Sequence, residues 1–488
     1  MALTVHRKSV KFIPDPKRVI TRFFMPGQED RAQAIIQRIV SLPEDSCRQL
    51  FNDVLRSFSK RHRNISKIFE TNFKNVEHLV KRNGFEPDAL TRERKLLIGS
   101  YFTQEYSIEA AAFFNPSIVE DPYQGNLNNG QLRVIASFRA TGEGHISSIV
   151  FRSGTFDSTN NLTFAPAGNF VDVPEMVKRH VYKKTTFLRK LEEMRIVKDV
   201  VGTVMDRLGD SFIYGELLAS IEETRKSIEI THTKEKVLQA INWLASSHYE
   251  ITFSLDTAIS ERVIFPVSYS ESNGIEDARF VKFTGEDGKV TYYATYTAYN
   301  GFTILPKLME TEDFYHFKIM PLHGNYAQNK GLALFPRKIG GKYAMISRCD
   351  GENIYIMYSD NINIWPDAVK IREPFLPEEF VKIGTAGSPI ETERGWLLIT
   401  HGVGPVRTYT LGAVLLDLDN PTRVIAYLDT PLLAPTEEER EGYVPNVVYS
   451  CGSIVHNGEL IIPYGMSDYS SSFATVGLEN LLDEMTAV

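Results

Sequence analysis

The chain of 488 residues has little of what marks several common classes of protein. Its three cysteines, Cys47, Cys349 and Cys451, are odd in number and lie far apart in the sequence. That pattern argues against a disulfide framework and a cysteine-based zinc site, and it predicts a reducing compartment. No apolar run is long enough to span a bilayer, and the N-terminus lacks the apolar core of a secretory signal. We therefore expect a cytoplasmic protein that does not bind membranes.

Other absences narrow the chemistry. The formal net charge of −7 gives the chain no general attraction to nucleic acid. No Gly-rich loop precedes a helix as in nucleotide-binding proteins, and no Gly-x-Ser-x-Gly elbow occurs. No spacing of carboxylates and histidines matches a metal-binding signature. We expect neither a nucleic-acid partner nor a bound metal.

Helical patterns occupy two parts of the chain. After an extended arm over residues 1–25, Ser41-Leu42-Pro43-Glu44 reads as a capping box. A following helix stops at Gly84, and another spans about residues 91–113. A second helical block, at about residues 174–248, interrupts β-structure on both sides, which indicates an insertion.

From Phe114 onward the remainder of the chain reads as short strands with turn signals every 10 to 15 residues. Polar residues collect repeatedly at the strand ends, and a propeller brings such ends together at one axial mouth. The sequence thus predicts a mainly β protein in two parts. Residues 1–113 form an N-terminal arm and helical extension, and residues 114–488 form a β-propeller that carries the helical insertion.

Two adjacent acids, Glu276 and Asp277, lie between a turn and a strand-like run. Adjacent residues of an extended chain point to opposite faces. We therefore expect one carboxylate to face a pocket and the other to brace the frame, for example against Arg279. Taken alone, this stretch would be read as a surface turn with solvated acids.

Further polar residues fall at the ends of predicted strands: Asn115, Arg139, Glu276, Asp277, Asn329, Lys330, Arg348, Lys382, His401 and Asp468. Three of these residues are cations, Lys330, Arg348 and Lys382, and they lie with His401 on neighbouring predicted strand ends. Each residue alone would be read as structural or as part of the surface. Together, the three cations and the histidine predict a cradle for an oxyanion.

A series of short motifs carries a resemblance to a known family. They are Phe114-Asn115-Pro116, Gly274-Ile275-Glu276-Asp277-Ala278-Arg279, Tyr296-Thr297-Ala298-Tyr299, Asn329-Lys330 with Leu334-Phe335-Pro336, Lys382-Ile383-Gly384, Gly395-Trp396-Leu397-Leu398, His401-Gly402-Val403, the run 411–417, the run 444–448 and Tyr464-Gly465. In this order they resemble the β-mannoside phosphorylases and related β-mannosidases of glycoside hydrolase family 130, in its longer branch. The resemblance implies a five-bladed β-propeller.

The resemblance also implies roles for the site residues. Asp277 matches the general acid of an inverting reaction on a β-mannoside, in which the proton passes through the sugar 3-hydroxyl. The positions that hold phosphate are matched by Lys330, Arg348, Lys382 and His401. The substrate-binding positions are matched by Asn115, Arg139, Glu276, Arg279 and Asp468. The chain departs from the family at Ala278, where proline is usual, and around Asp468, where Gly-Ala-Ala-Asp is commoner.

The choice between phosphorolysis and hydrolysis follows from the nucleophile. A hydrolase needs a second carboxylate to activate water, whereas phosphate is already an anion and needs cations to bind it. The retained cations favour a phosphorylase that acts on β-1,2-linked manno-oligosaccharides, with inorganic phosphate as co-substrate and no cofactor. We also expect a homo-oligomer.

Two alternatives remain open from the residues. One is an inverting β-1,2-mannosidase whose base would be Glu120, Asp121, Glu378 or Glu379. The other is a non-catalytic carbohydrate-binding propeller whose helices recruit a partner.

Overall fold

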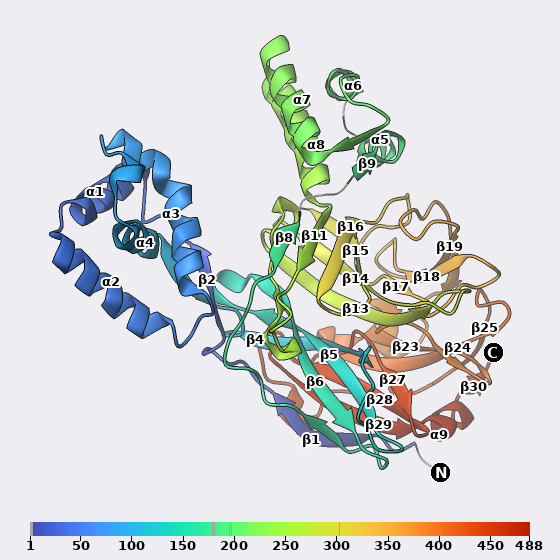
Figure 1. Ribbon diagram of the computed structural model, residues 1–488. Helices are drawn as coiled ribbons and strands as arrows, with labels where there is room; N and C mark the ends of the chain where they lie inside the picture. The colour runs from blue at the N-terminus through green and yellow to red at the C-terminus, as the bar shows by residue number, and fades with distance from the viewer. Residues whose placement is uncertain (1–2, 178–180, 195, 197, 302) are drawn as a thin grey trace.

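The computed structural model describes residues 3–177, 181–194, 196, 198–301 and 303–488, and its larger body is built of β-strands (Figure 1). Within these residues, five antiparallel sheets have four or more strands each. We number them sheets 1 to 5 by the order in which most of their strands occur in the chain. The mainly β character predicted from the sequence is confirmed.

The strands of the five sheets have the following bounds. Sheet 1 contains β4 (Ala112–Glu120), β5 (Leu132–Thr141), β6 (Ser147–Phe156), β7 (Leu162–Phe164) and β12 (Val263–Ile264). Sheet 2 contains β8 (Glu175–Val177), β11 (Tyr249–Thr252), β13 (Gly274–Thr284), β14 (Val290–Tyr299), β15 (Ile304–Thr311) and β16 (His316–Pro321). Sheet 3 contains β17 (Ala333–Leu334), β18 (Tyr343–Ser347), β19 (Ile354–Ser359) and β20 (Ala368–Arg372). Sheet 4 contains β21 (Lys382–Thr385), β22 (Ile390–Thr392), β23 (Gly395–Val403), β24 (Tyr409–Leu416), β25 (Val424–Tyr427) and β30 (Thr486–Ala487). Sheet 5 contains β1 (His6–Phe12), β26 (Val448–Tyr449), β27 (Ile454–His456), β28 (Glu459–Met466) and β29 (Ser470–Gly477).

Inner strands such as β23 are apolar on both faces because sheets pack against them from both sides. In β23, Leu397 and Ile399 enter the core shared with sheet 5, whereas Trp396 and Leu398 enter the core shared with sheet 3. This alternation is the two-residue period of a strand. Comparable apolar cores lie between sheets 1 and 2, between sheets 2 and 3, and between sheets 5 and 1.

The N-terminal arm is part of the β body. Strand β1 pairs antiparallel with β29, with His6 opposite Thr475 and Phe12 opposite Ser471. The N-terminal strand is therefore part of sheet 5, next to a strand from the C-terminal part of the chain. After β1, strand β2 (Val19–Phe23) pairs with β3 (Thr103–Ser107). The chain enters the N-terminal helices from β2 and leaves them through β3.

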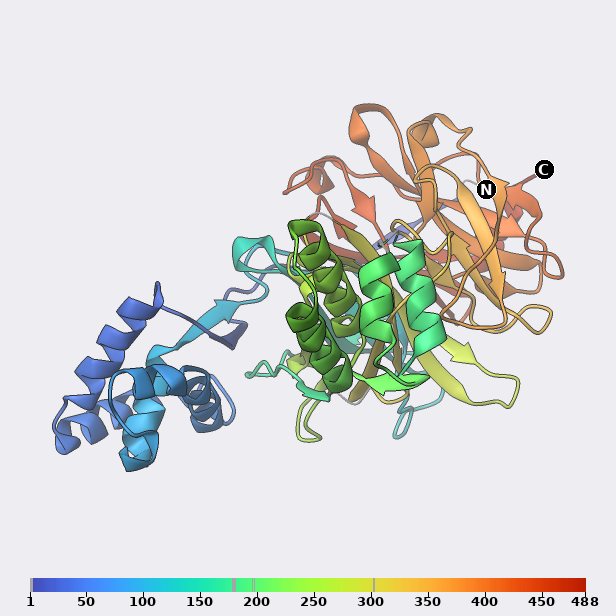
Figure 2. The same ribbon diagram turned by 90° about the horizontal axis from the view of Figure 1, so that it is seen from above.

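The N-terminal helices form a unit with its own core that stands to one side of the β body (Figures 1 and 2). They are α1 (Glu29–Val40), α2 (Glu44–Phe58), α3 (Ile65–Arg82) and α4 (Arg92–Tyr101). The buried Arg94 donates hydrogen bonds to the carbonyls of Ile39 and Val40, at 2.6 and 2.9 Å. Arg94 thus satisfies carbonyl groups that the end of α1 leaves without a partner in the helix.

Two predictions about these helices were wrong. The helix expected over residues 91–113 ends at Tyr101, because the chain next pairs with β2 as β3, and the β-propensity of Thr103 and Tyr106 prevails. The capping box at Ser41–Glu44 does not form, since Pro43 is the residue before α2. The carboxylate of Glu44 instead accepts hydrogen bonds from Thr91 and Arg94, at 2.8 and 2.7 Å. The predicted stop before Gly84 is confirmed.

The second helical block stands on sheet 2 (Figure 1). It contains α5 (Lys184–Glu193), α6 (Lys198–Met205), α7 (Tyr214–Ser227) and α8 (His232–Ser246), with a small sheet of β9 (Val181–Lys183) and β10 (Ser211–Ile213). These helices share an apolar core of their own. None of the helices in the described ranges has the length and apolar character that crossing a bilayer requires.

A buried charged group ties sheet 2 together. Glu271 accepts hydrogen bonds from Lys307 Nζ at 2.6 Å, Tyr249 Oη at 2.9 Å and Tyr296 Oη at 2.8 Å. The side chains of Glu271 and Lys307 are both inaccessible to solvent. Removing one partner of such a pair leaves an uncompensated buried charge.

Replacing Lys307 by Met is expected to lower the free energy of unfolding by about 3–5 kcal/mol. Chemical denaturation followed by tryptophan fluorescence measures this loss. Lys318→Met is the matched control, because Lys318 is half exposed in the same sheet and pairs with Glu310 at 3.3 Å. The control is expected to cost less than about 1 kcal/mol. Equal losses in the two variants would contradict the prediction.

Candidate active site

A cavity of about 380 Å³ lies where strand ends and loops of all five sheets converge. Its lining contains ten of the eleven candidate residues named from the sequence: Asn115, Arg139, Glu276, Asp277, Asn329, Lys330, Arg348, Lys382, His401 and Asp468. Residues that are up to 353 positions apart (Asn115 to Asp468) thus share one cavity, as the pattern of polar strand ends predicted. The exception is Arg279, which is only 2% exposed and lies behind the cavity wall. It donates a hydrogen bond to Tyr449 Oη at 2.7 Å.

Glu276 and Asp277 both line the cavity, so the expectation that they face opposite sides was wrong. The pairing of β13 with β14 shifts register between Glu276 and Arg279, which marks a bulge. Asp277 adopts a left-handed backbone with φ of 55°. A bulge re-aims side chains that strict alternation would separate. Both carboxylates therefore reach the same hollow.

The acidic end of the cavity is a network around these two carboxylates. Asn115 Nδ2 donates to Asp277 Oδ1 at 2.7 Å, and Arg139 Nη1 lies 3.5 Å from the same oxygen. Arg139 Nη2 also donates to Glu276 Oε1 at 2.9 Å. The other oxygen of Glu276 accepts from Lys330 Nζ. Asp277 is thus oriented by an amide, while Glu276 holds two cations in place.

Three residues at this end have left-handed backbones, with φ of 49° at Asn115, 55° at Asp277 and 52° at Asp468. Such conformations are uncommon outside glycine and gather at functional sites, where surrounding structure enforces them. Close packing helps to enforce this geometry at the start of β13. A Cβ on Gly274, whose φ is 129°, would lie 2.4 Å from the hydroxyl of Ser147.

The two aspartates at this end titrate differently. Burial alone would raise the pKa of Asp277, but Arg139, Arg279 and the hydrogen bond from Asn115 outweigh it and hold the pKa below its ordinary value. Burial and the neighbouring charge of Asp277 raise the pKa of Asp468 to about 6. Near neutral pH, the carboxyl group of Asp277 is therefore ionised.

The opposite end of the cavity is basic. Arg348 Nη1 lies 3.0 Å from His401 Nε2, and His401 Nδ1 lies 3.1 Å from the carbonyl of Thr385. Burial and the charges of Arg348, Arg279 and Lys382 hold the pKa of His401 well below its ordinary value. The imidazole is therefore neutral, donates to Thr385 and accepts from Arg348. His401 orients the guanidinium of Arg348.

The basic end has no counter-charge of its own. No carboxylate in the described part of the chain pairs with Arg348 or Lys382, and Arg348 Nε is buried without a hydrogen-bond partner there. The ammonium of Lys382 lies 5.5 Å from the centre of the Tyr409 ring. A Cβ on Gly384 would lie 2.6 Å from His401 Cε1 and 3.0 Å from Arg348 Nη1, so glycine permits this close approach. Unpaired cations in a concave site are suited to bind an anion.

The carboxylates that could serve as a hydrolytic base lie elsewhere. Glu120 accepts from Lys282 at 2.5 Å, and Glu379 accepts from Arg372 at 2.9 Å. Neither Glu120, Asp121, Glu378 nor Glu379 is among the described residues that line the cavity. The carboxylates of the described residues that do line the cavity belong to Glu276, Asp277 and Asp468.

Sequence reasoning missed Arg407, Tyr409 and Tyr449, which also line the cavity. Arg407 lies in a turn in which it and Val406 have φ of 56° and 54°. A β-branched residue in this conformation is an outlier that no propensity predicts. An internal repeat could have found the turn. The turn after β5, over residues 142–146, has the same form as the turn after β23, over residues 404–408. Each begins with a glycine three positions after a cavity residue: Gly142 after Arg139, and Gly404 after His401.

No group of three or more His, Cys, Asp or Glu side chains is placed to hold a metal ion anywhere in the described ranges.

Comparisons of the sequence with known proteins agree on a family. A family model described as beta-1,4-mannooligosaccharide phosphorylase matches residues 234–487. A 1,2-beta-oligomannan phosphorylase of Thermoanaerobacter sp. (strain X514) is 36% identical over 43% of this chain and 71% of its own. A beta-1,2-mannobiose phosphorylase of Listeria innocua is 30% identical over 51% of this chain and 72% of its own. A solved structure of the Listeria innocua beta-1,2-mannobiose phosphorylase with beta-1,2-mannobiose has a TM-score of 0.44 and 21% identity, and the match covers 77% of this chain and 92% of that one.

Proposed function

Because the chain belongs to glycoside hydrolase family 130, we propose that it is an inverting β-mannoside phosphorylase. It cleaves β-1,2-linked manno-oligosaccharides with inorganic phosphate and releases α-mannose 1-phosphate. The relatives named for β-1,2-linked substrates support the linkage. The observation that carries the proposal is the cavity itself, which places Asp277 at one end and the unpaired cations Arg348 and Lys382 at the other.

The fold that supports this site is proposed to be a five-bladed propeller. Each sheet shares an apolar core with the next, and the core between sheets 5 and 1 joins the last to the first. Strand β1, paired with β29, would fasten the final blade. Residues 1–113 then supply that strand and the helical extension, and the helical block at residues 174–248 is an insertion into blade 2.

The mechanism assigns one task to each end of the cavity. The mannosyl unit lies between the two ends, held by Asn115, Arg139 and Asp468. Arg348 and Lys382, together with Lys330 from the acidic end, bind phosphate and direct an oxygen at the anomeric carbon. As the phosphorus-bound oxygen bonds to that carbon, the glycosidic bond breaks and its electron pair stays on the leaving oxygen.

The carboxyl group of Asp277 donates a proton to the sugar 3-hydroxyl, and the 3-hydroxyl passes its own proton to the leaving oxygen. For that step the carboxyl of Asp277 must be protonated, although neighbouring cations and Asn115 hold its pKa below the ordinary value. Bound phosphate offsets the positive charge that depresses this pKa, and bound sugar removes water from the carboxyl group. Both effects raise the pKa of Asp277 when the substrates are present. Substrate binding therefore favours the protonated form of Asp277, which can act as the acid.

Phosphate dependence tests this function. With β-1,2-mannobiose and phosphate, the protein is expected to form α-mannose 1-phosphate and mannose in equal amounts, which anion-exchange chromatography measures. Without phosphate, sugar release is expected to fall to background, because in the described part of the chain only the three carboxylates at the acidic end line the cavity. Undiminished mannose release in phosphate-free buffer would instead identify a β-1,2-mannosidase. No turnover with binding intact would identify a carbohydrate-binding propeller.

A further inference from the structure

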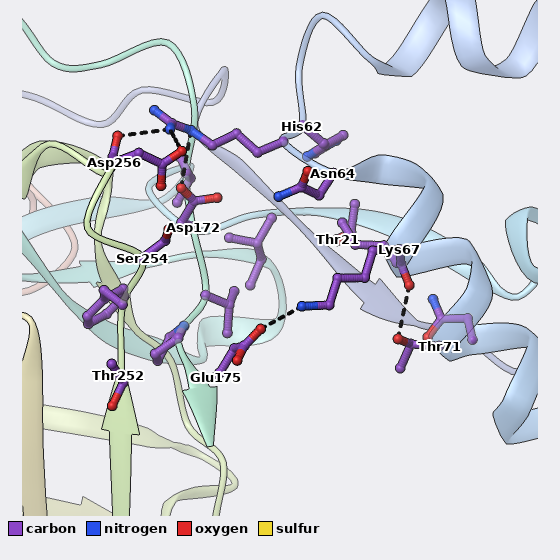
Figure 3. Close-up of a pocket in the computed structure, with 18 of the residues that line it drawn as sticks. Thr21, His62, Asn64, Lys67, Thr71, Asp172, Glu175, Thr252, Ser254 and Asp256 are labelled. Carbon is purple, nitrogen blue, oxygen red and sulfur yellow. Dashed lines mark hydrogen bonds and ion pairs between the residues drawn. The ribbon is translucent and has the colours of Figure 1, made fainter. Parts of the chain in front are cut away.

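A second cavity, of about 710 Å³, lies where the N-terminal helices meet the β body (Figure 3). We call it the junction pocket. Its walls come from β2, the start of α3 with the residues just before it, and two further segments, over residues 171–175 and 252–256. Among the described residues, it shares no lining side chain with the candidate active site. Only its last wall falls within residues 234–487, so the junction pocket depends on parts of the chain outside the family match.

The charged side chains of the junction pocket are engaged with one another. Arg63 lies 3.3 Å from Asp172, 3.1 Å from Asp256 and 2.6 Å from Glu261. Lys67 reaches across to Glu175 at 2.6 Å, as Figure 3 shows. His62 is hydrogen-bonded to Glu105 at 2.7 Å. A charged ligand would have to break these pairs, so the pocket is suited to a neutral one.

Neutral groups remain free to bind such a ligand. Asn64 precedes α3 with φ of 50°, and its side chain makes no capping hydrogen bond. Neither the Asn64 amide nor the Thr21 hydroxyl has a hydrogen-bond partner among the described residues. Apolar surface lies beside them, since Phe23 is 40% exposed and Ile68 also lines the pocket. Amide and hydroxyl groups beside an aromatic ring match the alternating polar and apolar faces of a sugar.

We propose that the junction pocket is a second carbohydrate site, which binds a neutral manno-oligosaccharide while the active site holds another. The identity of the sugar rests on the function proposed above. The volume lies within the range of about 300–1,000 Å³ that small-ligand pockets occupy. The N-terminal helical extension thereby retains longer chains on the enzyme, and chains of two sugars, which fill the active site alone, gain nothing from it.

The test uses the full chain with Asp277→Asn, so that the probe is not consumed, and β-1,2-mannotetraose as the probe. The double variant Asn64→Gly with Thr21→Val removes both free groups, and glycine accepts the left-handed backbone at position 64. Asn126→Gly with Thr163→Val is the matched control, because Asn126 also has a left-handed φ, of 61°, and neither residue lines the junction pocket. Isothermal titration calorimetry counts the molecules bound to each chain.

The parent and the control are expected to bind two molecules of mannotetraose per chain. In the double variant, the second site is expected to weaken by roughly thirtyfold, since two hydrogen bonds are lost. With Asp277 restored, the same double variant is expected to raise the KM for mannotetraose and leave the KM for mannobiose unchanged. A single bound molecule in the parent, or unchanged binding in the double variant, would overturn the proposal. Failure of the proposed function would appear separately, as absent phosphorolysis by the unsubstituted enzyme.

Discussion

Replacement of Asp277 by Asn is expected to lower kcat/KM for phosphorolysis of β-1,2-mannobiose by about 10²–10⁴-fold, the usual contribution of a general acid. Asparagine keeps the size of the side chain and still accepts the hydrogen bond that Asn115 donates at 2.7 Å. It has no acidic proton for the leaving oxygen. Release of α-mannose 1-phosphate measures the loss, and calorimetry with β-1,2-mannobiose is expected to show that sugar binding survives.

A change of leaving group separates this role from a structural one. An aryl β-mannoside whose phenol has a low pKa needs no proton as it departs, so the Asp277→Asn variant is expected to recover most of its rate with that substrate. Asp287→Asn is the matched control, because Asp287 lies in the turn between β13 and β14, at the far end of the hairpin that carries Asp277. The control is expected to keep full activity. An Asp277→Asn enzyme that cleaves mannobiose normally would remove Asp277 from the mechanism.

The candidate site could be predicted from the sequence to the extent that strand ends could be recognised. His401 ends an apolar run, Lys330 precedes one, and the structure brings both to one cavity. Side chains alternate between two cores where a strand is regular, as in β23. Strand ends and alternation are local features of the sequence. The convergence of the five sheets on one cavity then brings the strand ends together. This is why residues far apart in sequence could be assigned to one site.

The rest depended on backbone geometry that side-chain patterns do not encode. The bulge in β13 that turns Glu276 and Asp277 to the same side arises from its pairing with β14. The left-handed turn that carries Arg407 contains a valine, which propensity would place in a strand. Arg279 lies behind the cavity because its guanidinium is directed to Tyr449, a residue 170 positions away. Tertiary pairing decided each of these features.

The proposed binding of phosphate at the basic end of the cavity can be tested at Lys382. Replacing Lys382 by Met is expected to raise the KM for phosphate by about 10- to 100-fold, because a charge-assisted contact to the anion is lost. The KM for β-1,2-mannobiose is expected to change little, since the mannosyl contacts lie at the other end of the cavity. Initial rates measured against each substrate in turn separate the two constants.

Lys370→Met is the matched control for this change. Lys370 lies in β20 of the neighbouring sheet, where its side chain is 45% exposed and pairs with Glu373. The control is expected to leave both constants unchanged, because a solvated ion pair contributes little. A Lys382→Met enzyme that keeps its affinity for phosphate but loses affinity for mannobiose would place the sugar, not the anion, at the basic end. Phosphate would then bind without Lys382, and the assignment of the basic end of the cavity to the anion would be wrong.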